Sequence, residues 1–96
     1  MKKYIKKPIL VEAMQFEYTP ECLVKLSKWM GDAMGTSGKE RHPKALGWLR
    51  VKTLEDGQDE YKVAYIATEG DYILKGIQGE FWAVKPHIFE STYEEA

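Results

Sequence analysis

The chain has 96 residues, of which 44% are hydrophobic and 12% aromatic, a composition that supports one domain with a buried core and excludes a disordered segment. Its 14 basic and 15 acidic side chains give a formal net charge of -1, which argues against a general binder of the phosphate backbone. Cys22 is the only cysteine, so no internal disulfide can form, and no stretch approaches the ~18 apolar residues of a membrane-spanning helix. We expect one soluble domain over residues 1–96, acting in a reducing cytoplasm.

A strand is predicted from Ile9 to Phe16, and a helix from Pro20 to Met30. Thr19 can cap the helix, and Pro20 occupies the first turn, where a missing N–H costs nothing. Gly31 can adopt the left-handed conformation that closes the last turn. The apolar side chains form one stripe at a spacing of three and four, namely Leu23, Leu26 and Met30.

Residues 31–47 follow the helix and show no sustained hydrophobic period. They contain four glycines and one proline, which is the composition of a linker. A loop of this length within a small domain is commonly functional or mobile. We therefore predict a mobile loop over residues 31–47.

Four strands joined in hairpins are predicted in the second half of the chain. "WLRVKTL" alternates, so that Leu49 and Val51 face one side while Trp48, Arg50 and Lys52 face the other. The polar turn "EDGQDE" leads to the returning strand "YKVAYIAT". "DYILK" and "EFWAVK" form a second hairpin around residues 76–79, and Lys85-Pro86 ends the last strand.

These elements predict an α+β fold, with one strongly curled, mainly antiparallel sheet of about five strands and one packed helix. The strands carry apolar residues on both faces, and one helix cannot cover both faces of a flat sheet. Curling hides part of the uncovered surface. Self-association hides more, and we therefore also expect a homodimer or a higher homo-oligomer.

Both ends of the chain carry motifs with a family resemblance. "GDYILKGIQGEFWAVKPHIFESTYEE" resembles the signature G-D-Y-I-I-K-G-x-x-G-E-F-Y-x-x-K-P-x-I-F-E-x-T-Y-E of a family of small, uncharacterised phage and prophage proteins. The start "KKYIKKPILVEAMQF" is similar to the opening of the same family. Glu69 stands where the family often has proline, and Trp82 where it usually has tyrosine. The resemblance implies a phage-encoded protein in the cytoplasm of a bacterial host, and it implies no particular activity.

Several motifs are better explained by folding than by chemistry. The Gly76-Ile77-Gln78-Gly79 stretch has strands on both sides, whereas a phosphate-binding G-x-x-G loop requires an adjacent helix start. The possible soft metal ligands lack paired spacing, so neither a metal nor another cofactor is indicated; they are Cys22, His42 and His87. The acidic turn lacks the spacing of a calcium loop and is typical of a solvated turn; it holds Glu55, Asp56, Asp59 and Glu60.

Basic and aromatic residues on one strand face are the remaining candidates for a binding site. Alternating aromatic and cationic side chains can stack on a ring and neutralise phosphate. The candidates are Trp48, Arg50 and Lys52, joined by Lys75, Trp82 and Lys85 if the strands are neighbours. The simpler interpretation is that both tryptophans pack in the core and the cations are ordinary solvated residues.

We expect a non-enzymatic binding module with no catalytic residues, active in the interplay between phage and host. It would capture a host factor or a nucleotide-type small molecule, as counter-defence proteins do. One alternative is a nucleic-acid accessory protein that uses the basic and aromatic face. A further alternative is a hydrolase with carboxylates from residues 55–60.

Overall fold

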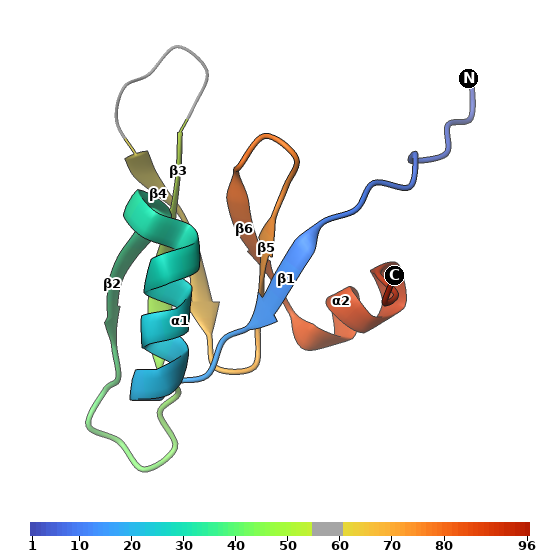
Figure 1. Ribbon diagram of the computed structural model, residues 1–96. Helices are drawn as coiled ribbons and strands as arrows, with labels where there is room; N and C mark the ends of the chain where they lie inside the picture. The colour runs from blue at the N-terminus through green and yellow to red at the C-terminus, as the bar shows by residue number, and fades with distance from the viewer. Residues whose placement is uncertain (55–60) are drawn as a thin grey trace.

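Two antiparallel sheets of three strands each form the body of the molecule (Figure 1). The computed structural model describes residues 1–54 and 61–96. The first sheet has the strand order β1-β5-β6, with bounds Glu12–Gln15, Tyr72–Lys75 and Phe81–Val84. The second has the order β2-β3-β4, with bounds Met34–Gly38, Trp48–Leu54 and Tyr61–Thr68. The other described elements are the helices α1 (Pro20–Met30) and α2 (Pro86–Thr92) and the short 3-10 turn η1 (Gly31–Ala33).

The α+β class is confirmed, but the single, strongly curled sheet of about five strands is wrong, because neither of the two sheets is strongly curled. The chain changes sheets between β4 and β5. Gly70 turns with a φ of 96°, and its N–H donates to the Phe16 carbonyl at 2.9 Å. The Phe16 N–H in turn donates to the Asp71 carbonyl at 2.8 Å. These bonds align β5 with β1 instead of with β4. The strand β1 itself is shorter than the strand predicted from Ile9 to Phe16.

The helix α1 has the bounds and the caps that the sequence predicts. Thr19 Oγ1 accepts a hydrogen bond from the Cys22 N–H at 3.2 Å, and Gly31 closes the helix with a φ of 57°. Leu26 and Met30 are buried against the inner faces of both sheets. The buried core cluster comprises Phe16, Leu26, Met30, Ala33, Leu49, Val51, Ala67, Ile73 and Phe81.

The segment 31–47 is only partly a loop, because η1 and β2 lie within it and β2 pairs with β3. Its glycines are the reason that sequence periodicity misses this strand. A Cβ at Gly35 would lie 2.9 Å from Arg50 Cβ, and a Cβ at Gly38 would lie 2.7 Å from Trp48 Cζ2. Glycine therefore allows β2 to lie against two large side chains of β3. Mobility of residues 39–47 stays a prediction.

The second helix, α2, covers the outer face of the first sheet and was not expected from the sequence. Phe89 stacks on Tyr72 with ring centres 3.9 Å apart, and Tyr93 stacks on Phe89 at 5.3 Å. Leu74, which faces the same side of β5 as Tyr72, is fully buried. The apolar residues on both faces of this sheet are thus accounted for by α1 on one side and α2 on the other.

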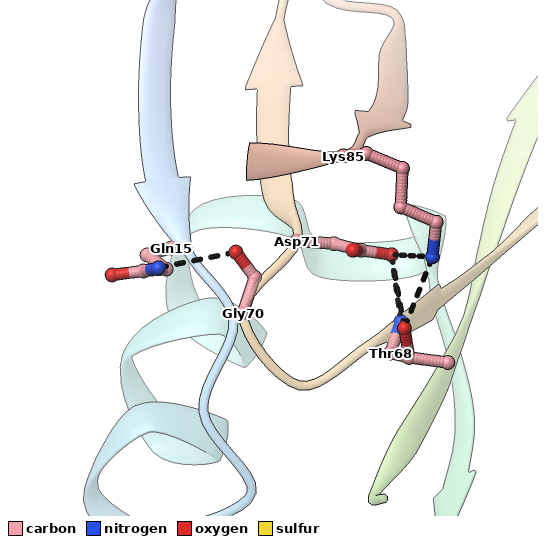
Figure 2. Close-up of polar contacts among 5 residues, drawn as sticks. All are labelled: Gln15, Thr68, Gly70, Asp71 and Lys85. Atoms are coloured by element: carbon pink, nitrogen blue, oxygen red, sulfur yellow. Dashed lines mark hydrogen bonds and ion pairs between the residues drawn. The ribbon is translucent and has the colours of Figure 1, made fainter. Parts of the chain in front are cut away.

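A buried carboxylate links one end of the first sheet to one end of the second sheet (Figure 2). Asp71 is 3% exposed, and its Oδ2 accepts from the Thr68 N–H at 2.9 Å and from Lys85 Nζ at 3.1 Å. Lys85 Nζ also donates to Thr68 Oγ1 at 3.1 Å. Gln15 Nε2 donates to the carbonyl of Gly70 at 3.1 Å. One carboxylate therefore joins the end of β4, the start of β5 and the end of β6.

Replacing Leu26 by alanine should lower the free energy of unfolding by about 2–5 kcal/mol, because this fully buried side chain would leave a cavity between α1 and both sheets. Val24→Ala is the matched control on the same helix, since Val24 is 52% exposed and should change stability by no more than about 0.5 kcal/mol. Urea unfolding measures both. Equal losses would contradict the docking of α1 through Leu26.

Asp71→Asn should lower the free energy of unfolding by about 1–3 kcal/mol, because the amide loses the ion pair and part of a buried, charge-assisted hydrogen-bond set. Lys85→Ala should cost less, because the Lys85 side chain is 53% exposed and the two Thr68 donors remain. Glu69→Gln, two residues away, is the control. Urea unfolding in which Asp71→Asn behaves like Glu69→Gln would show that the carboxylate is not a structural link.

Candidate ligand-binding groove

A groove of ≈ 720 Å³ lies where the two ends of the chain approach the β5–β6 hairpin. One wall is the extended segment 6–11 that precedes β1, and another is the segment 92–96 that follows α2. Figure 1 shows the N-terminal segment leaving β1 on the side of the molecule that carries α2. The hairpin contributes Gly76, Ile77, Glu80 and Trp82. The size falls within the usual range for small-molecule sites.

The lining of the groove combines aromatic rings with charges of both signs. Trp82 and Tyr93 supply the rings, and Lys6 and Lys7 supply cations from the N-terminal wall. Acidic side chains line the groove as well, namely Glu80, Glu94 and Glu95, and most of the other lining side chains are apolar, among them Pro8, Ile9, Leu10, Val11 and Ile77. Such a groove can bind a flat ring that carries both an anionic group and hydrogen-bond donors.

The backbone of the hairpin positions Trp82. The Gly76 N–H donates to the Glu80 carbonyl at 2.9 Å, and the Gly79 N–H donates to the Gly76 carbonyl at 3.1 Å. Gly79 has a φ of 81°, which favours glycine. A Cβ at Gly76 would lie 3.1 Å from Trp82 Cζ3, so the indole packs closely over this turn. The stretch 76–79 is therefore a hairpin turn, as the sequence predicts, and it supports one wall of the groove.

Trp48 and Arg50 lie together on the outer face of the second sheet, away from this groove. The guanidinium of Arg50 lies 4.7 Å from the centre of the Trp48 ring, and Arg50 Nη1 donates to Thr36 Oγ1 at 2.6 Å. The tryptophan ring also lies against Gly38. The Arg50 guanidinium thus already contacts Trp48 and Thr36, although the side chain remains exposed to solvent. Lys52 follows on the same strand, where it is opposite Val63.

The remaining three predicted site residues lie in three different environments on the first sheet. Trp82 lines the groove. Lys75 is on the opposite face of the sheet, with its Nζ 5.6 Å from the centre of the Phe81 ring. Lys85 is held by Asp71 at 3.1 Å. The six predicted residues therefore do not form one continuous face, although Trp48 and Arg50 contact each other.

Sequence reasoning missed the groove because its walls come from distant parts of the chain. The run of lysines before β1 and the glutamates after α2 were visible as opposite charges at the two ends. No local pattern indicates that these two segments lie on either side of Trp82. Asp71 was missed as well, since a single aspartate beside a turn glycine is typical of a surface turn.

The other candidate residues form no metal site in the described residues, which hold no group of three or more His, Cys, Asp or Glu side chains arranged for an ion. Cys22 Sγ accepts from the Glu17 N–H at 3.4 Å and donates to the Gln15 carbonyl at 3.6 Å. His42 Nδ1 accepts from the Lys44 N–H at 3.1 Å. The acidic turn of residues 55–60 lies outside the described residues.

Among the described helices, none has the length and apolar character needed to span a membrane.

Comparisons with protein-family models, with curated proteins and with solved structures found no match. The function is therefore inferred from the geometry of the groove and from the chemistry of its lining.

The double variant Arg50→Ala/Lys52→Ala should unfold within about 1 kcal/mol of the parent, because an exposed cation contributes roughly 0–1 kcal/mol to stability. Thermal unfolding followed by circular dichroism measures the effect. A much earlier transition would show that the stacking of Arg50 on Trp48 stabilises the second sheet.

Proposed function

We propose that this protein is a non-enzymatic binding module that captures a nucleotide-type small molecule in the groove between residues 6–11 and 92–96. The observation that carries the proposal is that Trp82 lines the same groove as Lys6 and Lys7. An aromatic ring for stacking and a pair of cations for phosphate are the two groups that nucleotide binding needs most.

The acidic side of the groove favours a nucleotide over a simple anion. Glu94 and Glu95 line the groove together with the lysines, so the groove does not carry a purely positive charge. A carboxylate accepts hydrogen bonds from ribose hydroxyls and from the exocyclic amino groups of bases. A phosphate on the lysines, a base on Trp82 and hydroxyl or amino donors on the glutamates would engage the basic, aromatic and acidic residues of the lining.

The biological setting that we propose rests on the resemblance of both chain ends to phage and prophage proteins. The groove is built largely from these two regions, since Lys6 and Lys7 belong to the family-like start and Trp82 to the family-like end. We propose a phage-encoded protein that sequesters a nucleotide of the bacterial host in the cytoplasm and so acts in counter-defence. Sequestration needs a binding site and no catalytic group.

The nucleic-acid alternative places the site on the outer face of the second sheet, at Trp48 and Arg50. Two observations count against it. The guanidinium of Arg50 already stacks on Trp48 and bonds Thr36. In addition, the formal net charge of -1 does not attract a polyanion at long range.

Trp82→Ala should weaken nucleotide binding by about 1–3 kcal/mol, the usual contribution of one stacked base. The probes are ATP, GTP and cyclic di-AMP, and isothermal titration calorimetry measures the affinity.

Lys6→Ala/Lys7→Ala should weaken binding and reduce its dependence on salt, because two phosphate contacts are lost. Lys2→Ala/Lys3→Ala is the matched control, since these lysines precede the groove on the same segment.

Two results would contradict the groove as the binding site. One is the absence of saturable binding of any of the three probes to the parent. The other is a loss of binding in Arg50→Ala/Lys52→Ala while Trp82→Ala binds normally, which would move the site to the second sheet and favour the nucleic-acid alternative.

A further inference from the structure

The strand β4 is an edge strand with an uncovered apolar surface. It is the last strand of the β2-β3-β4 sheet and pairs only with β3 in the described part of the chain. All six residues from 61 to 66 are exposed. Four of them are large and apolar, with exposed fractions of 40% for Tyr61, 50% for Val63, 42% for Tyr65 and 59% for Ile66. Ala67, by contrast, reaches the core and is buried.

This edge is less protected against edge-to-edge pairing than the other outer strand of the same sheet. Protected edges are short, are bulged, or carry charges, glycine or proline. The other outer strand of the same sheet, β2, has five residues, two glycines and an irregular register with β3. Residues 61–66 contain no glycine and no proline, and their protection consists of one charge, at Lys62, and of the register shift that leaves Ala64 without a partner on β3. Such an edge is suited to pairing with another strand.

The register between β3 and β4 determines which β4 side chains share a face. It shifts between Val51 and Lys52, so that Tyr65 is opposite Val51 whereas Lys62 is opposite Thr53. Val51 and Thr53 alternate with Lys52 and therefore face the same side of the sheet. Lys62 and Tyr65 thus share the face of the buried Val51. The same reasoning places Val63 and Ile66 on the face of Lys52 and Arg50.

We infer that β4 pairs with β4 of a second copy of this chain, antiparallel and about a twofold axis. Pairing two copies of β4 requires that opposed residues share a face. The shifted register meets this requirement when residue 62 of one copy lies opposite residue 65 of the other, and residue 61 opposite residue 66. Lys62 then lies opposite Tyr65 of the second copy, and Tyr61 lies opposite Ile66 of the second copy.

The chemistry of these pairs is complementary. An ammonium beside an aromatic ring is attracted by the ring, and an aromatic residue opposite a β-branched residue is a favourable cross-strand pair. Each of these contacts occurs twice because of the twofold symmetry. A register that places Lys62 opposite Lys62 of the second copy is disfavoured by like-charge repulsion. The single charge on the strand therefore disfavours the alignment in which the two copies of Lys62 face each other.

The dimer joins two sheets into one continuous sheet with the order β2-β3-β4-β4-β3-β2. The groove on the first sheet is formed by other segments, so each copy keeps its own. This inference therefore does not depend on the proposed function, and either can fail without the other.

Tyr65→Lys is the sharpest test, because it places a lysine opposite Lys62 of the second copy at two symmetric positions. Sedimentation equilibrium should show a dimer for the parent and at least tenfold weaker association for Tyr65→Lys. Adding Lys62→Glu should restore the dimer, now with strong dependence on salt, since each glutamate faces a lysine. Ile66→Lys, on the other face of the strand, should also weaken association and should not be rescued by Lys62→Glu.

Leu46→Lys is the control, because Leu46 is a 55% exposed apolar residue outside β4 and its replacement should leave the dimer intact. Circular dichroism establishes that each variant is folded. A parent that stays monomeric at several hundred micromolar overturns the inference. A dimer that Tyr65→Lys and Ile66→Lys leave unchanged overturns it too, as does a folded Tyr65→Lys variant that Lys62→Glu does not rescue.

Discussion

The arrangement of this domain depends on the buried carboxylate of Asp71. Its contacts with Thr68 and Lys85 hold together the end of one sheet and two strands of the other. Because the chain crosses between sheets at this point, β5 pairs with β1, and among the described residues β4 pairs with β3 alone. Lys85, which contacts the same carboxylate, directly precedes α2, and α2 runs from Pro86 across the outer face of the first sheet. The groove and the exposed strand are therefore both consequences of where the chain crosses.

The two sheets differ in how the apolar side chains on their faces are covered. In the first sheet, Leu74 is buried on the outer face, where Tyr72 stacks on Phe89 of α2. In the second sheet, the core reaches only the inner residues of β3 and the last part of β4. The described residues place no helix over its outer face, and the start of β4 extends beyond α1 (Figure 1). Association with a second copy would cover the edge that residues 1–54 and 61–96 leave exposed.

Local signals predicted α1 and the two hairpins because their determinants are neighbours in sequence. Thr19, Pro20 and Gly31 specify the helix ends through backbone bonds within one turn. The strand β2 could not be predicted in the same way, since its glycines become favourable only when Trp48 and Arg50 lie against them. The helix α2 carried one usable signal, a proline in its first turn like that of α1. The partition into two sheets and the groove had no local signal, because both depend on contacts between distant segments.

The pairing of β1 with β5 has a consequence for the order of folding. The second sheet follows the chain order β2-β3-β4, and the β5–β6 hairpin is equally local. By contrast, Glu12 pairs with Lys75, a separation of 75 − 12 = 63 residues. Closing so large a loop is entropically costly before any contact compensates for it, and such pairings form slowly. During refolding, the hairpins should acquire amide protection first, and β1 should join the first sheet in a late step.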